Sequence, residues 1–286
     1  MTRSAAPCHH RAMQGVPGQF EHPSDMAQFR HPPHRAGLEL YRAHIVRHAF
    51  ELHCHDGFGL GAIESGVECF RYRGAQHLAP PDSLVTMNAG ELHTGRAETE
   101  GGWHYRMVYI DPALAAQITG EPGWWFDQPV CMDAAGARQA SALLEALWQA
   151  DEPLAFDSLL ATLLDRFRPH ARMPRAAPAQ ASIRFAPVID YLHAHLAERL
   201  GLDQLAAVAG LSPFHFLRQF RAQHHATPQQ MLMALRLSRA KRLLDAGIPP
   251  AQVAADTGLS DQAHLTRAFA RRYGVTPARY QRQVRG

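Results

Sequence analysis

The chain has 286 residues and a net charge of +3, and at about 150 residues per domain its length predicts two domains. Its hydrophobic content of 46% is ordinary for a globular protein. It has no run of about 18 apolar residues, so we expect neither a transmembrane helix nor a membrane partner. The N-terminus lacks the apolar stretch of a secretory signal, and the 4 cysteines lie far apart, which favours reduced thiols and a cytoplasmic location.

Charge is distributed unevenly along the chain. From Ile183 to the end there are 14 basic and 6 acidic side chains, a net charge of +8, whereas residues 1–182 carry a net charge of −5. A basic module attached to an acidic sensor would show this division, because basic domains bind polyanions such as nucleic acids. The alternative is that the uneven distribution of charge arose by chance. Charge alone therefore suggests a nucleic-acid partner but does not establish one.

The first half of the chain predicts a β domain. Residues 1–36 are rich in His, Pro and Gly without apolar periodicity, and we expect them to form a disordered arm. Residues 38–110 consist of short alternating or β-rich segments, separated by Gly, Pro and Asp turns. Several short strands at this spacing indicate an antiparallel barrel or sandwich.

Two amphipathic helices and a linker are expected next. Leucines recur on one face within residues 138–150 and again within residues 154–168, which predicts a helical hairpin. Its apolar stripe either mediates dimerisation or covers the β domain; the residues are Leu159, Leu160, Leu163 and Leu164. Residues 169–182 are rich in Pro and Ala and predict a semi-rigid linker, after which the chain becomes helical.

An internal repeat is the strongest signal in the sequence. Residues 205–228 and 253–277 match at an offset of 48, which becomes 49 after Ser260. Each copy reads as a short helix that ends at a glycine, Gly210 or Gly258, followed by a serine that can cap a second helix. Such a pair is either a helix-turn-helix or an ordinary helical hairpin, and duplication with basic outward faces favours DNA binding.

The C-terminal region also resembles a known family. The block VAADTGLSDQAHLTRAFARRYGVTPARY at 253–280 resembles the C-terminal signature of AraC/XylS-type transcription regulators. LRLSRAKRLL at 235–244 is similar to the helix that links the two DNA-binding units of that family. The resemblance covers residues 183–284 and implies helix-turn-helix units at about 202–225 and 250–273, which read successive major-groove segments of double-stranded DNA.

The resemblance also implies which residues read DNA. In the first unit the base-reading positions fall on Phe214, Leu217 and Arg218, and in the second they fall on Gln262, Ala263, Thr266 and Arg267. The first set is less polar than a typical reader, so its readout would rest on Arg218 and contacts to thymine methyl groups. We expect Arg271 and Arg272, one turn later, to contact phosphate.

The β region resembles the cupin-type sensing domain of the same family. The resemblance spans residues 38–112, and it rests on HCHDGFGLGAIESGVECFRYRGAQHLAPPDSLVTMNAGELHTG at 53–95 and GGWHYRMVYIDP at 101–112. It implies a small barrel that binds a small-molecule effector. The expected fold class is therefore α+β: a cupin-like domain with its helical hairpin over residues 37–168, and an all-α DNA-binding domain over residues 183–286.

Three histidines are the central candidates in the sensor. His53 and His55 would share one face of a strand, and His93 follows a glycine turn. They could recognise the effector, bind a metal ion or be ordinary core residues. The glutamate of metal-binding cupins is replaced here by Gly59 or Leu60, so we expect no metal and no cofactor. Tyr105 and Arg106 are further candidates for effector binding.

These features together predict a DNA-binding transcription regulator, in which a cupin-like domain senses a small molecule. We expect a homodimer that acts as an activator or, alternatively, as a repressor, with RNA polymerase as a further partner. One alternative is a metal-dependent cupin enzyme with a DNA-binding tail. Another is an architectural DNA binder that responds to no ligand. The effector and the operator are not determined by the sequence.

Overall fold

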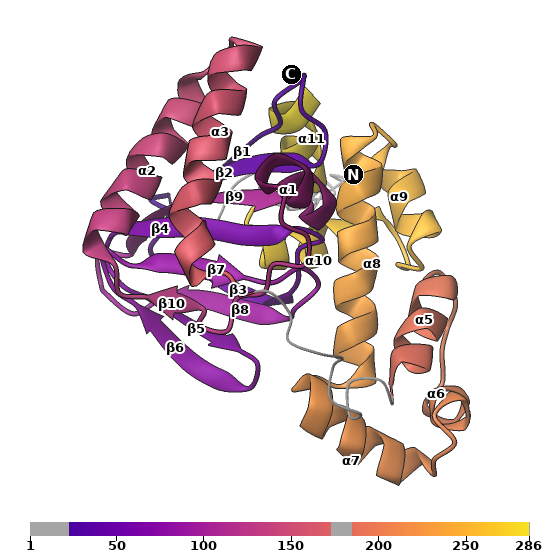
Figure 1. Cartoon of the computed structure of the whole chain (residues 1–286). Helices are drawn as coiled ribbons and strands as arrows, with labels where there is room; N and C mark the ends of the chain where they lie inside the picture. Colours follow the sequence, from indigo (N-terminus) through magenta and orange to yellow (C-terminus); the bar gives the residue numbers. More distant parts are fainter. Residues whose placement is uncertain (1–22, 173–184, 286) are drawn as a thin grey trace, which may run out of the picture.

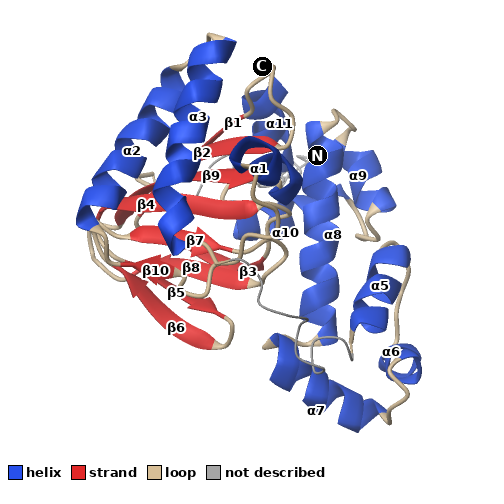
Figure 2. Cartoon of the chain, viewed as in Figure 1, coloured by secondary structure: helices blue, strands red, loops and turns tan. Residues whose placement is uncertain are grey.

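The computed structural model describes residues 23–172 and 185–285. A β-rich region, covered on one side by helices, comes first along the chain, and a helical region follows and lies beside it (Figures 1 and 2). The expected α+β organisation is confirmed. None of the described helices has the length and apolar character that a membrane crossing requires.

Two antiparallel sheets face each other in the first region. One has the strand order β1-β2-β9-β4-β7-β10 and the other β3-β8-β5-β6. No strand pairing within the described residues joins them into a closed barrel, so the domain is a sandwich, and the small barrel that the resemblance implied is not formed. The strands are β1 (Met26–Arg30), β2 (Leu38–Ile45), β3 (Ala49–His53), β4 (Phe58–Ser65), β5 (Glu68–Tyr72), β6 (Ala75–Ala79), β7 (Leu84–Met87), β8 (His93–Ala97), β9 (Trp103–Ile110) and β10 (Val130–Cys131).

The disordered arm was predicted to extend too far. Strand β1 pairs in register with β2, with Met26 opposite His44, so the ordered sheet begins inside the segment that was expected to be an arm. Residues 1–22 lie outside the described part of the chain. Most of the predicted linker, residues 173–182, does as well, whereas Arg172 pairs with Trp125 as an isolated bridge.

Alternation along the strands gives the larger sheet two apolar faces. In β2, Tyr41 faces the interior between the sheets, while Leu40 belongs to the cluster on the outer face. That outer face is covered by helices α2 (Ala134–Gln149) and α3 (Pro153–Phe167), which form the predicted hairpin. Helix α1 (Pro112–Thr119) and the short η1 (Arg168–His170) complete this layer.

The leucine stripe is therefore not a dimerisation surface. Leu160, Leu163 and Leu164 are fully buried against the sheet of their own chain, and Leu159 is partly buried in the same cluster. The outer face of the sheet is apolar, so it has to be covered, and α3 covers it with the residues expected to mediate dimerisation. Helices α2 and α3 instead cover the β domain, which was the other interpretation of the hairpin.

The described part of the C-terminal region, residues 185–285, is made of helices. Helices α6 and α7 form the first helix-turn-helix unit, α8 is the linking helix, and α9 and α10 form the second unit, close to the predicted bounds. The helices are α5 (Ala186–Ala194), α6 (Leu202–Val208), α7 (Pro213–His224), α8 (Pro228–Asp245), α9 (Pro250–Asp256), α10 (Gln262–Tyr273) and α11 (Pro277–Arg285).

The turns of the two units agree only partly with the repeat. Gly210 and Gly258 both have the positive φ expected at the end of a first helix, +64° and +69°. Ser212 is the N-cap of α7 but makes no capping hydrogen bond. In the second unit the cap is Asp261, not Ser260, and its carboxylate accepts from the backbone N–H of His264. The extra residue after Ser260 supplies this stronger cap.

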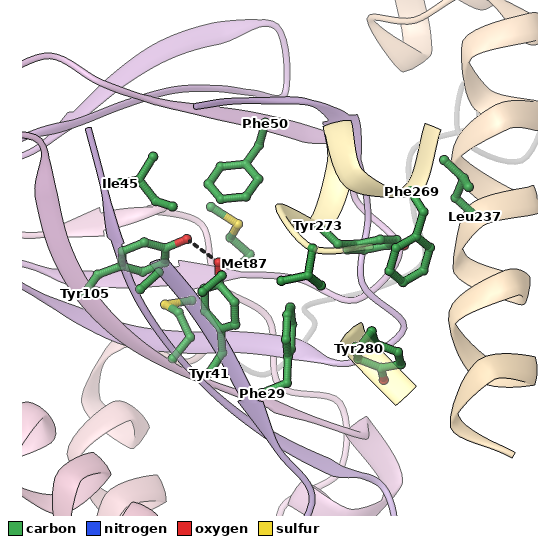
Figure 3. Packing of buried hydrophobic residues seen from close by; sticks show 14 of the residues in the cluster. Phe29, Tyr41, Ile45, Phe50, Met87, Tyr105, Leu237, Phe269, Tyr273 and Tyr280 are labelled. Atoms are coloured by element: carbon green, nitrogen blue, oxygen red, sulfur yellow. Dashed lines mark hydrogen bonds between the residues drawn. The ribbon is translucent and has the colours of Figure 1, made fainter. Parts of the chain in front are cut away.

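The interior of the sandwich continues into the second unit. Phe29, Tyr41 and Tyr105 between the sheets belong to the same buried cluster as Phe269 and Tyr273 of α10 and Tyr280 of α11 (Figure 3). The first unit has a separate core, which is formed around Phe185, Phe216 and Phe220.

Candidate functional site

A pocket lies between the two sheets, and the DNA-binding region closes it. Tyr41 and Tyr105 line it from the strands, and Arg272 and Tyr273 line it from α10. Its water-accessible space is about 30 Å³, enough for one or two waters or an ion. Sites for drug-sized molecules are roughly ten times larger or more. In this arrangement the pocket can therefore hold a water molecule or an ion but not a drug-sized molecule.

The three predicted histidines come together in this pocket. His53 of β3 pairs directly with His93 of β8, and their ring centroids are 4.2 Å apart. The centroid of His55 lies 5.0 Å from that of His53 and 5.2 Å from that of His93. Burial lowers the pKa of His93 to about 4 and lowers the pKa values of His53 and His55 well below the usual range. All three imidazoles are therefore neutral at physiological pH.

The other two candidates for effector binding, Tyr105 and Arg106, lie on opposite faces of the sheet, because they are adjacent residues of strand β9. Tyr105 points into the pocket, with its hydroxyl 3.4 Å from that of Tyr41 (Figure 3). Arg106 points outward, where its guanidinium pairs with Glu64 at 2.6 Å and with Glu145 of α2. The assignment of Arg106 to the pocket is therefore wrong.

Glu68 is a pocket residue that the sequence did not single out. It is buried and lines the pocket together with the histidines and Tyr105. Burial raises the pKa of its carboxyl to about 8, so the group is protonated and neutral at pH 7. The pocket therefore presents uncharged donors and acceptors along its sensor walls.

A buried ionic cluster joins the sensor to the DNA-binding region. The carboxylate of Glu39 in β2 pairs with Lys241 of α8 at 2.5 Å and accepts from the hydroxyl of Tyr280 at 3.1 Å. His31 bridges Glu39 and Asp245, with each ring nitrogen 2.8 Å from a carboxylate oxygen. Burial raises the pKa of Glu39, but Lys241 and His31 outweigh that effect, so its pKa is lowered and it remains ionised.

Sequence reasoning missed this cluster, although one signal pointed to it. Lys241 is the only lysine among the 29 basic side chains of the chain. Its ammonium group lies 5.0–5.6 Å from the ring centroids of Phe29, Tyr109, Tyr273 and Tyr280, which adds cation–π attraction to the ion pair. A cleft with about 380 Å³ of water-accessible space opens beside it, between the two regions.

Arg272 also binds the sensor rather than facing solvent. It is 7% exposed, its Nε donates to the carbonyl of Leu52 at 2.9 Å, and its guanidinium pairs with Glu51 at 3.2 Å. The expected phosphate contact is therefore impossible in this arrangement, because the sensor covers the side chain. Arg271 is 66% exposed and can still reach a phosphate.

The predicted base-reading residues lie on the outer faces of the two recognition helices. On α10, Gln262, Ala263 and Arg267 are exposed, and the hydroxyl of Thr266 donates to the carbonyl of Gln262. On α7, Phe214 is 84% exposed, Arg218 is exposed and Leu217 is half-buried.

Comparison with known proteins agrees with this geometry. Residues 35–164 match the model of an AraC-like ligand binding domain, and residues 205–283 match that of a helix-turn-helix domain. The HTH-type transcriptional regulator YbfI of Bacillus subtilis is 27% identical over 80% of this chain and 86% of its own length. The MmsAB operon regulatory protein of Pseudomonas aeruginosa is 24% identical over 92% of this chain and 83% of its own length.

The overall fold is shared with a solved regulator. The structure of an apo variant of ToxT from Vibrio cholerae superposes with a TM-score of 0.58 at 8% identity, over 87% of this chain and 98% of that one. Both relatives are named as regulatory proteins, and the solved structure shows that the fold is shared. The chain belongs to the AraC/XylS family of transcription regulators, with an N-terminal ligand-binding domain and a C-terminal helix-turn-helix DNA-binding domain.

Proposed function

We propose that this regulator controls DNA binding by holding its second helix-turn-helix unit against the sensor until an effector alters that contact. One observation carries the proposal: the recognition helix α10 forms a wall of the sensor pocket through Arg272 and Tyr273. A ligand that enters the pocket or the adjoining cleft would therefore touch both regions. Such a ligand shifts the equilibrium only if it binds the docked and released arrangements with different affinity.

The small-molecule character of the effector has support from the cleft and from a fold neighbour. One Vibrio cholerae ToxT structure is described as bound to an unsaturated fatty acid, and it superposes on this chain with a TM-score of 0.56. The cleft beside Lys241 falls within the usual volume range of small-molecule sites. We propose that the effector enters there, between Glu39 of the sensor and α8.

DNA readout is proposed to fall on the exposed faces of α7 and α10. Arg218 and Arg267 would contact bases, and Arg271 would contact phosphate. These roles extend the family resemblance to the side chains that the docked structure leaves exposed.

The assembly and setting of the regulator are also proposals. We propose a homodimer, because two chains would place four recognition helices on adjacent segments of DNA. Its interface lies outside the buried leucine stripe. We further propose that the protein acts as an activator and contacts RNA polymerase. Its proposed location is the cytoplasm, where the DNA is accessible.

The decisive experiment tests whether breaking the contact between the sensor and the DNA-binding region changes the affinity for DNA. Genomic fragments captured by the full chain would supply a bound duplex, on which fluorescence anisotropy would compare wild type with Glu39→Gln. This change removes the carboxylate that pairs with Lys241 and His31, so release should raise DNA affinity. Glu98→Gln, which removes a surface pair with Arg96 at 2.7 Å, serves as the control. Equal affinities for the two variants would contradict the proposal.

A further inference from the structure

The histidine cluster carries an inference that does not depend on the proposed DNA control. We propose that His53, His55 and His93 bind one divalent transition-metal ion of the zinc class, within the sensor pocket. One ring nitrogen from each histidine lies within 4.8 Å of those of the other two. Zinc–nitrogen bonds of about 2.0–2.1 Å bring ligand atoms to about 3.4 Å from one another. Small rotations of the rings would close that difference.

Hydrogen bonds already set two of the rings for coordination. The Nδ1 of His53 lies 2.7 Å from the carbonyl of Glu51, and the Nδ1 of His93 lies 3.1 Å from the carbonyl of Glu91. A carbonyl can only accept, so Nδ1 carries the proton in each ring. The lone pair then belongs to Nε2, and ligating histidines in proteins are oriented by outer hydrogen bonds of this kind.

The third ring contributes an unsatisfied atom. The Nε2 of His55 is buried and has no hydrogen-bond partner among the described residues. The ring is stacked on Tyr109, with centroids 3.9 Å apart, which fixes its plane. A buried polar atom without a partner is costly, and a metal ion bound to His53 and His93 would satisfy it.

The surroundings favour an ion over an organic occupant at this point. The water-accessible space of about 30 Å³ accommodates a metal ion and a water molecule. Three neutral nitrogens suit Zn²⁺, Ni²⁺ or Cu²⁺ better than Mg²⁺ or Ca²⁺, and they leave a fourth position open to the pocket.

The glutamate expected of a cupin metal site is therefore not needed. Gly59 and Leu60 occupy the positions where it would lie, and Gly59 lies beside Tyr109 and Met107 of the neighbouring strand β9. A Cβ at Gly59 would already lie 3.2 Å from the ring of Tyr109. The site that remains is a three-nitrogen site, closed on one side by Tyr273, whose ring centroid is 6.1 Å from that of His53.

Cobalt substitution tests the inference in the full chain without DNA. Metal-free protein is titrated with Co²⁺, and we expect one equivalent to give visible ligand-field bands of a tetrahedral site, which Zn²⁺ then abolishes. His93→Gln and His53→Gln should weaken Co²⁺ binding by more than the roughly 10- to 100-fold that loss of an outer partner costs. His77→Gln, on β6 and outside the cluster, is the matched control and should bind as wild type.

A second measurement guards against misfolding of the variants. Thermal unfolding of each metal-free variant is compared with that of wild type, and Zn²⁺ should raise the melting temperature of wild type and His77→Gln but not of the two cluster variants. Absence of the bands from wild type would overturn the inference. Bands of equal intensity in the cluster variants would overturn it as well, because the metal would then be held elsewhere.

Discussion

The two helix-turn-helix units share a sequence pattern but differ in what surrounds them. The first, α6 and α7, packs around its own core of Phe185, Phe216 and Phe220, with Leu92 of the sensor as a partly buried neighbour. The second, α9 and α10, shares one continuous buried cluster with the interior of the sandwich. The repeat thus folds into two similar helix-turn-helix units, and the second unit shares its core with the sensor.

The basic residues of α7 and α10 also differ in what surrounds them. Helix α7 keeps Arg218 in solvent, whereas α10 divides its basic residues between two surfaces. Arg267 and Arg271 face outward, and Arg272 is held by Glu51 and the carbonyl of Leu52. The second unit therefore shares its core with the sensor, whereas the first unit meets the sensor at its edge, where Gly74 lies against the ring of His225.

The largest expected effect tests whether the second unit and the sensor form one cooperative body. Phe269→Ala should destabilise the protein by about 3–5 kcal/mol, because the side chain is fully buried. It should also raise amide exchange in β1 and its partner β2, since Phe269 is linked through Tyr280 to Phe29 of β1. Hydrogen exchange resolved by segment measures both effects.

The matched change in the first unit is Phe220→Ala, which is equally buried. Its cost should be confined to α5, α6 and α7, because their core is separate. Phe214→Ala on the exposed face should change the free energy of unfolding by less than about 0.5 kcal/mol. If Phe269→Ala and Phe220→Ala leave the sensor equally protected, the two units do not differ as described.

Docking should weaken at alkaline pH through His31. Burial disfavours its charge, but Asp245 and Glu39 outweigh burial and raise the pKa of His31 to about 9; Lys241 and Tyr280 face the same carboxylate of Glu39. The contribution is fully present below about pH 6.5, the unfolded value, and is lost as the pH rises through about 9. Its size is up to about 3 kcal/mol, at 1.36 kcal/mol per pKa unit.

The measurement compares wild type with His31→Gln by denaturant unfolding between about pH 6.5 and 9.5. The stability difference between the two should shrink as pH rises, because neutral His31 cannot donate to both carboxylates. Using the difference removes other titrating groups shared by both proteins. A difference that stays constant over this range would show that His31 is not charged in the folded protein.

Release of Arg272 should have a smaller effect, confined to the contact between α10 and β3. Arg272→Ala removes the hydrogen bond to Leu52 and the pair with Glu51, a loss of about 1–3 kcal/mol of docking free energy. Faster amide exchange in α10 and higher DNA affinity are the expected results. Arg138→Ala on α2 is the control, because it removes an exposed ion pair with Asp82 that lies within the sensor. Weaker DNA binding by Arg272→Ala would instead support a phosphate contact.

Local patterns in the sequence were sufficient for much of this fold. Apolar periodicity, the repeat and the glycine turns predicted the helices within a few residues. His53 and His55 do meet in the pocket, but not as two residues of one strand face, because β3 ends at His53. The contact between the two regions could not be predicted from the sequence, because Glu39 and Lys241 are 202 residues apart in the chain. The leucine stripe shows the same limit, since an apolar helix face looks alike whether its neighbour is another chain or its own sheet.

The subtlest prediction concerns DNA readout, where the exposed residues of α10 should separate into two classes. Arg267 is exposed beside Gln262 and Ala263, and an arginine that bonds both acceptors of a guanine contributes roughly 1–3 kcal/mol of discrimination. Arg267→Ala should therefore lose that amount on the captured duplex and relax preference at one or two base pairs.

Arg271→Ala provides the contrast on the same helix. A phosphate contact adds affinity without sequence information, so this variant should weaken binding to specific and scrambled duplexes alike and reduce the salt slope by about one. Titrations of both variants against both duplexes at several salt concentrations measure the difference. If Arg267→Ala loses equal affinity on the two duplexes, Arg267 is a surface cation, and base reading by the second unit must then rest on Gln262 and its neighbours.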